Sequence, residues 1–446
     1  MNKSIFSVFV PILLLLSILS CSDENDTESE SVQGEIEFIK IVGGIKNETA
    51  NSVIKTNDGG FAILGFTQSN DGDVIDKIDE SYDYWVIKFD TKNELQWSKT
   101  YGGANDERGQ DIIQTNDEGF FITGFSKSND GDVSTSFGSN DYWVAKLDIK
   151  GTIIWEKSFG FSGTDQAFSA IQTSDGGYLI TGTLDVTASS QQGNDRSSLS
   201  KKHAGGDYWA VKLDSNGTKQ WRRFYGGSNT DTAYDVIETD DNGYLMVGLS
   251  DSNDVDVTDN KGTYDFWCVK IDSKGVLVWE KSYGGSETDQ AYCVAKSSNG
   301  NFIITGDVRS NDNDVSSNYG SADIWTIMIN PLGEIIWEKN YGGSGFDTSK
   351  AVISSRNGGF YITGNSRSED NDVTSNKGNN DVWVLKIDDS GNIEWEKSIG
   401  GTEIDLAFDV AELNDGSVVI VGESWSSDSD IPENKGFSDL LIIKLK

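Results

Sequence analysis

Residues 110–159 contain four short runs rich in β-branched and aromatic residues. They read Gln110-Asp111-Ile112-Ile113-Gln114-Thr115, Phe120-Phe121-Ile122-Thr123-Gly124-Phe125, Asp141-Tyr142-Trp143-Val144-Ala145-Lys146-Leu147-Asp148 and Ile153-Ile154-Trp155-Glu156-Lys157-Ser158-Phe159. Turn residues bound them, such as Asn116-Asp117-Glu118-Gly119. Short runs bounded by Asn, Asp and Gly are typical of β-strands, and helical periodicity is absent. The stretch therefore predicts four consecutive antiparallel strands.

The same four-strand unit occurs seven times. Successive units start 58 or 59 residues apart, except that the third is 66 residues long, from Gly160 to Gly226. Each starts at a Gly pair or its relic: Gly43-Gly44, Gly102-Gly103, Gly160-Phe161, Gly226-Gly227, Gly284-Gly285, Gly342-Gly343 and Gly400-Gly401. Four antiparallel strands repeated at this period describe the blade of a β-propeller. A solenoid is the alternative, but solenoids usually need distinct capping repeats.

The two ends of the repeat array complement each other. Residues 35–41 precede the first Gly pair and match a fourth strand, whereas residues 439–445 match a third strand. Pairing the two closes the ring and removes two exposed sheet edges. We therefore predict an all-β, seven-bladed β-propeller of four-stranded antiparallel blades over residues 35–446, its last blade closed by the N-terminal strand.

The tryptophans and the second-strand glycines follow the repeat. One Trp recurs in third strands (Trp85, Trp143, Trp209, Trp267, Trp325, Trp383) and one in fourth strands (Trp97, Trp155, Trp221, Trp279, Trp337, Trp395). A recurring aromatic predicts packing between blades more than a binding site. The glycines predict close backbone approach between blades; they are Gly65, Gly124, Gly182, Gly248, Gly306, Gly364 and Gly422.

The N-terminus predicts export and a lipid anchor. Met1-Asn2-Lys3 and the apolar stretch 5–19, which is short for a membrane span, are typical of a signal peptide over residues 1–20. Ile18-Leu19-Ser20-Cys21 resembles the lipobox of bacterial lipoproteins, which makes Cys21 the lipidated residue. Residues 21–34 form an acidic, flexible tether. Its start, Ser22-Asp23-Glu24, resembles the export signal of surface-exposed lipoproteins in Bacteroidota.

Composition excludes some classes of function. The formal net charge of −36 argues against nucleic acid as a partner, because phosphate binding needs a basic surface. A single His argues against His-based catalysis and multi-His metal sites. Apart from Cys21, Cys268 and Cys293 lie in strand-like runs and are expected to be buried free thiols.

Acidic residues also recur, in three sets that an up-and-down blade places on one rim. A carboxylate follows each Gly pair by four residues: Glu48, Glu107, Asp165, Asp231, Asp289, Asp347 and Asp405. An Asp opens each third strand: Asp83, Asp141, Asp207, Asp265, Asp323, Asp381 and Asp439. Six loops between second and third strands carry Asp-x-Asp: Asp71/Asp73, Asp130/Asp132, Asp254/Asp256, Asp312/Asp314, Asp370/Asp372 and Asp428/Asp430.

Two interpretations of these acids stay open. Asp accepts hydrogen bonds from amides in tight turns. Alternatively, several oxygen ligands from adjacent loops suit Ca²⁺, and Asp-x-Asp resembles the start of a calcium loop. The full twelve-residue loop with its distal Glu is missing. The Asp-x-Asp residues are therefore a weak candidate calcium site.

Departures from the repeat are the candidate ligand-binding positions. The third unit has an insertion, residues 187–206, in place of Asp-x-Asp, with a basic group of Arg196, Lys201, Lys202 and His203. It is either a tolerated surface insertion or a ligand-contacting loop. Trp425 is the one Trp outside the two framework sets, and it either stacks on a sugar ring or covers a loop. Three further basic residues are expected to pair with local acids: Arg108, Arg222 and Arg223.

At these motifs the chain resembles β-propeller-repeat lipoproteins of Bacteroidota. The matching pieces are Tyr101-Gly102-Gly103, Asp175-Gly176-Gly177-Tyr178, Ser128 to Val133 and Asp141 to Asp148. The resemblance implies a propeller lipid-anchored at the cell outer membrane, exposed at the surface, and no particular enzyme activity.

The favoured function is a monomeric, non-enzymatic binding or scaffolding module for a glycan or an envelope protein. The alternatives are a glycan hydrolase or lyase and a purely structural surface module.

Overall fold

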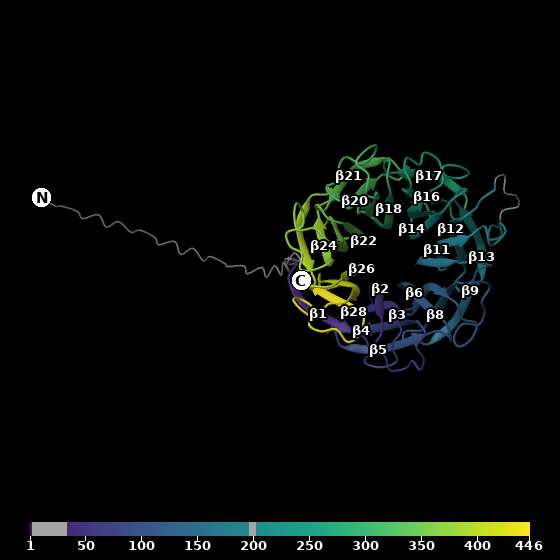
Figure 1. Cartoon of the computed structure of the whole chain (residues 1–446), viewed down its shortest axis with the longest axis horizontal. Coiled ribbons are helices and arrows are strands. Elements are labelled where there is room, and N and C mark those ends of the chain that lie inside the picture. Colours follow the sequence, from purple (N-terminus) through teal and green to yellow (C-terminus); the bar gives the residue numbers. More distant parts are fainter. Residues whose placement is uncertain (2–33, 196–201) are drawn as a thin grey trace. The chain divides into compact units, whose positions relative to one another are not determined.

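The computed structural model describes residues 34–195 and 202–446, together with Met1. In these ranges all regular elements are β-strands, and the 28 strands form seven four-stranded antiparallel sheets. The sheets are arranged in a ring, as Figure 1 shows. The predicted seven-bladed β-propeller is confirmed. The predicted signal peptide, Cys21, nearly all of the tether, Arg196 and Lys201 lie outside the described residues.

Each blade runs outward from the centre of the ring, and blades 1 to 7 are numbered by their innermost strands. The innermost strands are β2 (Glu48–Lys55), β6 (Glu107–Gln114), β10 (Gln166–Gln172), β14 (Asp231–Glu238), β18 (Asp289–Lys296), β22 (Asp347–Ser354) and β26 (Asp405–Glu412). The second strands are β3 (Phe61–Thr67), β7 (Phe120–Ser126), β11 (Tyr178–Asp185), β15 (Tyr244–Ser250), β19 (Phe302–Val308), β23 (Phe360–Ser366) and β27 (Val418–Ser424).

The outer half of each blade has two more strands. The third strands are β4 (Asp83–Phe89), β8 (Asp141–Leu147), β12 (Gly206–Leu213), β16 (Asp265–Ile271), β20 (Asp323–Ile329), β24 (Asp381–Ile387) and β28 (Asp439–Leu445). The outermost strands are β5 (Leu95–Tyr101), β9 (Ile153–Phe159), β13 (Lys219–Tyr225), β17 (Leu277–Tyr283), β21 (Ile335–Tyr341), β25 (Ile393–Ile399) and, for blade 7, β1 (Ile36–Val42).

Strand β1 closes the ring as predicted. It pairs antiparallel with β28, from Ile36 opposite Leu445 to Val42 opposite Leu440. The amide of Glu35 donates to the carbonyl of Lys446 at 3.1 Å, and the reverse bond measures 2.9 Å. Figure 1 shows the purple β1 beside the yellow β28. No blade is left with an unpaired third strand.

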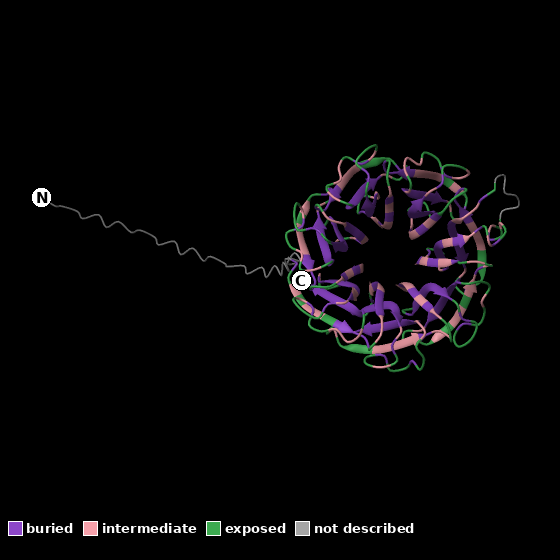
Figure 2. Cartoon of the chain, in the orientation of Figure 1, coloured by how far each residue is buried: buried purple, intermediate pink, exposed green. Residues whose placement is uncertain are grey.

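The cores lie between neighbouring blades. Second and third strands are almost fully buried, whereas the outermost strands are half-exposed (Figure 2). Every third-strand Trp is buried, and Trp143 illustrates the contact: the Tyr84 hydroxyl of blade 1 donates to its carbonyl at 3.0 Å, with ring centroids 4.7 Å apart. The fourth-strand Trp97 packs over Gly151 of blade 2, where an added Cβ would lie 2.9 Å from its ring. Both Trp sets therefore pack between blades.

The second-strand glycines were expected to allow close approach between blades; hydroxyls of the preceding blade do approach Gly124, Gly182 and Gly248, but the nearest neighbour of every second-strand glycine lies in its own blade. A Cβ on Gly65 would lie 1.7 Å from the carbonyl oxygen of Thr49, which belongs to the innermost strand of the same blade. The other six second-strand glycines meet their own innermost strands at 1.8–2.1 Å. The reason is a β-bulge beside each glycine, which brings the two backbones of one blade together.

Candidate functional site

The acids that follow the Gly pairs form part of the frame. All seven are fully buried. Each accepts a hydrogen bond at 2.7–2.8 Å from the backbone amide four residues earlier, and the Phe161 relic donates to Asp165 in the same way. Most also accept from Ser hydroxyls, such as Ser310 to Asp289 at 2.8 Å. The turn-amide interpretation holds for this set, and these acids do not lie on the surface of the rim.

The Asp-x-Asp residues fix the same turns from the other side. The first Asp accepts from the amide after the Gly pair at 2.7–3.0 Å in all six loops. In five of them the second Asp accepts from the amide of the first Gly at 2.9–3.2 Å. The contacts of these residues are thus those of turn caps.

The weak calcium interpretation of the Asp-x-Asp loops finds no support in this geometry. Across residues 34–195 and 202–446, no group of three or more His, Cys, Asp or Glu is arranged to hold a metal ion. A calcium ion needs six to eight oxygen ligands around one point. No such group includes the candidate ligands, which are Asp71, Asp73, Asp130, Asp132, Asp254, Asp256, Asp312, Asp314, Asp370, Asp372, Asp428 and Asp430.

Asp430 shows the contacts that such a residue makes. Its Oδ2 accepts a hydrogen bond from the amide of Gly400 at 3.2 Å, and the same oxygen pairs with the ammonium of Lys377 in blade 6. Both partners donate hydrogen, whereas a calcium ion would need further oxygen ligands beside this carboxylate. Asp430 is therefore a turn cap and an ion-pair partner between blades 6 and 7, and its role as a calcium ligand stays a prediction.

The Asp residues that open the third strands lie at the junctions between blades. In blade 1, a Cβ on Gly102 would lie 2.6 Å from Asp83 and 2.7 Å from Glu107, so two carboxylates flank this glycine. Burial raises the pKa of Asp83 to about 7 and that of Asp265 to about 7, with nearby acids adding to both shifts. The first glycine of each pair is therefore needed because its neighbours leave no room for a side chain.

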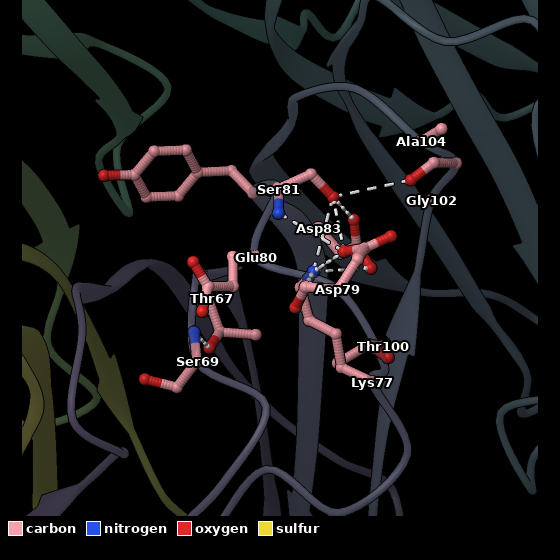
Figure 3. Close-up of polar contacts among 12 residues, drawn as sticks. Thr67, Ser69, Lys77, Asp79, Glu80, Ser81, Asp83, Thr100, Gly102 and Ala104 are labelled. Carbon is pink, nitrogen blue, oxygen red and sulfur yellow. Dashed lines mark hydrogen bonds and ion pairs between the residues drawn. The ribbon is translucent and has the colours of Figure 1, made fainter.

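Other cations bridge neighbouring blades along this rim as Lys377 does. Lys261 of blade 4 lies 3.1 Å from Asp314 of blade 5, and Lys435 of blade 7 lies 2.7 Å from Asp73 of blade 1. In blade 1 the cation and the acids that it pairs with lie in the same loop. Figure 3 shows Lys77 pointing at Asp79 and Asp83, and its Nζ is 3.5 Å from Asp83 Oδ2.

His203 occupies the same repeat position in blade 3. Its Nδ1 lies 2.6 Å from Asp207 Oδ2 and its Nε2 lies 3.9 Å from Asp256 of blade 4. The ring is 3% exposed and packs on Phe224. His203 is therefore a bridge between blades in the interior and does not face a ligand on the rim.

The described part of the insertion before the gap, residues 187–195, contacts its own blade. Asp195 pairs with Lys219 at 3.0 Å and with Arg222 at 3.2 Å. The Trp209 indole donates to the carbonyl of Gly193 at 2.8 Å, where four other blades use a Glu of the fourth strand. Lys202 is exposed. Arg222 pairs with an acid as predicted, whereas Arg223 stacks on Trp221 at 5.9 Å.

Trp425 lines a pocket that is separate from the interior position of His203. It is half-buried and lines a pocket of about 470 Å³ at the centre of the ring, which we name the central pocket. Six aromatic residues line it: Phe66, Tyr82, Phe125, Phe168, Phe408 and Trp425. Six neutral polar residues also line it: Asn47, Thr49, Asn51, Gln110, Gln166 and Ser438. Arg108 and Glu423 complete the lining. The central pocket that Trp425 lines includes neither His203 nor any other described residue of the insertion.

The β-bulges aim one residue of each innermost strand at this centre. Every innermost strand shifts register around a single residue: Asn51, Gln110, Phe168, Tyr234, Tyr292, Lys350 and Phe408. Four of these line the central pocket. The others continue the ring by contact, since Phe168 packs on Tyr234 and Tyr234 on Tyr292, both at 5.2 Å. Lys350 Nζ lies 3.3 Å from the Tyr292 ring centroid.

Every residue of the central pocket stands where the seven units differ. The positions equivalent to Trp425 hold Gln68, Lys127, Asp185, Asp251, Arg309 and Arg367. Those equivalent to Arg108 hold Thr49, Gln166, Thr232, Gln290, Thr348 and Leu406. The frame residues beside them barely change. Sequence reasoning found Trp425 and missed the other thirteen, although comparing the units position by position would have marked them.

Arg108 was expected to pair with a local acid, and its main contacts are instead aromatic. Its guanidinium carbon lies 4.9 Å from the centroid of Phe66 and 4.3 Å from that of Tyr82. The acid nearby is Glu423, which accepts a hydrogen bond from Thr49 at 2.5 Å. Burial raises the pKa of Glu423 to about 7, while Thr49 and the charge of Arg108 lower it.

The pocket has one carboxylate among its described lining residues. Glycoside hydrolysis commonly uses a pair of carboxyl groups on either side of the scissile bond. Glu423 has no second acid beside it in the lining. The arrangement suits binding through rings, amides and one guanidinium. Together, fold and pocket define a seven-bladed β-propeller with an asymmetric aromatic and polar pocket at its centre.

No protein-family model matches the chain. The regulatory protein FlaEY of Caulobacter vibrioides is 24% identical over 284 residues, which cover 59% of this chain and 30% of FlaEY. The match thus spans less than a third of that relative. BamB from Moraxella catarrhalis has a TM-score of 0.39 at 12% identity, covering 89% of this chain and 84% of BamB. The Neurospora crassa Pan2 WD40 domain has a TM-score of 0.48 at 10% identity, covering 92% and 89%.

Within the described residues there is no helix long and apolar enough to cross a membrane.

Proposed function

We propose that this protein is a surface-anchored, non-enzymatic binding module that holds a glycan at the central pocket. The observation that carries the proposal is that recurring and non-recurring residues of the repeat have different roles. The recurring acids serve the frame, whereas the residues that line the pocket all occupy positions at which the seven units differ. A structural module without a ligand would not need an asymmetric pocket at the centre of a regular ring.

The lining favours a glycan over an envelope protein. Sugar rings offer an apolar face to aromatic side chains and hydroxyls to amide groups. The pocket provides both kinds of group, with Trp425 and Phe408 from blade 7 and Gln110 and Gln166 from blades 2 and 3. Its volume of about 470 Å³ falls in the range of roughly 300–1,000 Å³ that is usual for small-ligand sites.

The binding proposal is tested with the purified full chain on an array of bacterial and plant oligosaccharides. We expect binding to at least one oligosaccharide, and Trp425→Ala should weaken it about tenfold or more, because stacking on an aromatic ring contributes strongly to a buried contact. Phe437→Ala is the matched control, since Phe437 is a 67% exposed aromatic residue outside the lining. Absence of binding to every oligosaccharide of the array, or an equal loss of binding in both variants, would contradict the proposal. Release of reducing ends from an oligosaccharide would favour a hydrolase.

The anchor is proposed from the sequence alone. Cys21 is expected to carry the lipid, and several acyl chains on one residue hold a protein firmly at a membrane. Labelling cells with an alkyne-tagged fatty acid should mark the wild-type protein and not Cys21→Ser. Added protease should cleave the protein on intact cells. Labelling of the serine variant would contradict the anchor, and protection from protease would contradict surface exposure.

A further inference from the structure

We infer that the glycan held at the central pocket carries a carboxylate, as a uronic acid residue does, and that Arg108 binds this group. The inference rests on the proposed function, because it names the chemistry of the ligand at the same pocket.

The Arg108 guanidinium is held in place by aromatic rings. The rings of Phe66 and Tyr82 contact its planar group at 4.9 and 4.3 Å and hold its orientation. In the described chain its side-chain N–H groups make no hydrogen bond to another residue. Arg108 is half-buried, and its nitrogen atoms are not among the fully buried polar atoms that lack a partner, so these donors are open to solvent. A guanidinium that is held in place with free donors on a pocket wall matches a carboxylate, which can accept two parallel hydrogen bonds.

The acid nearest to Arg108 in the lining, Glu423, has a hydrogen-bond partner of its own. Glu423 is the other charged residue of the described lining, and its Oε2 accepts from the Thr49 hydroxyl at 2.5 Å. Glu423 is therefore held by Thr49 and leaves the donors of Arg108 open. A ligand carboxylate can approach Arg108 without displacing a salt bridge within the protein.

The negative charge of the protein limits the number of acidic groups that a ligand can carry. The chain has a net charge of −36, which repels a polyanion at low ionic strength. At physiological salt, interactions between exposed charges are screened over about 8 Å, so a single buried contact is not opposed by distant acids. The remaining lining is neutral, with amides and rings. An isolated uronic acid within an otherwise neutral oligosaccharide fits these conditions.

The experiment compares each acidic oligosaccharide with the same molecule after reduction of its carboxylate to a primary alcohol. The probes are aldotetraouronic acid, a hyaluronan tetrasaccharide and a galacturonosyl-rhamnose disaccharide, titrated calorimetrically into the full chain. We expect at least one acid to bind about tenfold or more tightly than its reduced form, since hydrogen bonds to charged groups are the strong ones.

Three variants assign the effect to Arg108. Arg108→Gln should abolish the preference for the acid while the reduced form still binds. Arg108→Lys should retain only part of the preference, because lysine keeps the positive charge but cannot donate two parallel hydrogen bonds to one carboxylate. Arg309→Gln is the matched control, since Arg309 follows the second strand of blade 5 and is outside the pocket lining, and it should leave the preference unchanged. Thermal melting checks that each variant is folded.

The outcomes separate the two proposals. Equal binding of acid and reduced form by the wild type, or an unchanged preference in Arg108→Gln, overturns the acidic ligand and leaves glycan binding standing. Failure of every acid to bind overturns the inference as well. In that case, binding to a neutral member of the array still supports the proposed function, and silence of the array overturns both.

Discussion

At the scale of single residues, the seven carboxylates after the Gly pairs all have the same structural role. Each one is buried and accepts a backbone amide from the turn that connects two blades. Replacing such an acid leaves several buried donors without an acceptor, which costs roughly 1–3 kcal/mol per group. The acid therefore stabilises both its own blade and the one before it.

Asp289→Ala tests this role. Asp289 accepts from the amides of Gly285 and Ser310 at 2.7 and 3.2 Å and from the Ser310 hydroxyl at 2.8 Å. We expect the free energy of unfolding in urea to fall by about 2–4 kcal/mol, given these lost bonds. Glu287→Ala is the control, because Glu287 is exposed in the same loop and should change stability by less than about 0.5 kcal/mol. Equal effects of the two variants would contradict the assigned role.

The turn role of the acids could be predicted from the sequence, since a carboxylate four residues after a Gly pair is placed to accept a turn amide. Burial of the Asp that opens each third strand could not, because the residue pattern does not tell which side of a rim faces the neighbouring blade. His203 shows the same limit. A lone His in a basic insertion suggested a ligand contact, but its partners Asp207 and Asp256 come together only in the folded ring.

At the scale of elements, the pairing of β1 with β28 joins the two ends of the ring. The buried residues of β1 are Ile41 and Val42, and Ile41 packs in the core between blades 6 and 7. The exposed side of the strand carries Lys40. This contrast makes β1 the element whose contribution to the ring can be measured most directly.

Ile41→Asp should open the ring. A charge at a 3% exposed position must be buried without a partner, which is strongly unfavourable. We expect a fall in the melting midpoint of about 10 °C or more and faster proteolysis of the C-terminal blade, followed by mass spectrometry. Lys40→Asp adds the same group on the exposed side and should shift the midpoint far less. A closed, protease-resistant ring in Ile41→Asp would show that β1 is dispensable.

The outer three strands of blade 2 were predicted to within one residue, because their runs are short and sharply bounded, whereas the innermost strand β6 begins three residues before the predicted Gln110. The bulges in the innermost strands were not predicted. A bulge inserts one residue into a strand with a two-residue period, and the strands beside the Gly pairs hold too few apolar residues to show the break. Hence Phe168 and Phe408 were not recognised as pocket residues, and Arg108 was assigned to an acid rather than to the rings of its neighbours.

At the scale of the whole molecule, buried acids at the junctions make stability depend on pH. Burial, with nearby acids, raises the pKa of Asp83, Asp231 and Asp323 to about 7 and burial raises that of Asp439 to about 6. In the unfolded chain an Asp has a pKa near 3.9. The folded state therefore binds these protons more tightly, so stability is full below about pH 4 and is lost as pH rises through 6 to 7.

The melting midpoint should accordingly fall from pH 5 to pH 8 at constant ionic strength. Each raised group contributes about 1.4 kcal/mol per pH unit between its unfolded and folded pKa. Exposed acids such as Asp241, whose pKa the nearby Thr239 and Lys270 lower to about 2, act only at more acidic pH. Differential scanning calorimetry measures the trend, and a midpoint that rises between pH 5 and pH 8 would contradict it.

The closure of the ring by β1 also sets the order in which the molecule can fold. Some four hundred residues separate β1 from β28, and contacts between such distant segments form late because loop closure costs more entropy as the loop grows. During synthesis from the N-terminus, blades 1 to 6 can be completed before β28 is available to pair with β1. An unpaired strand is a template for wrong pairing. We therefore expect the joining of the ends to follow the completion of blades 1 to 6, and the nascent chain to be exposed to wrong pairing until then.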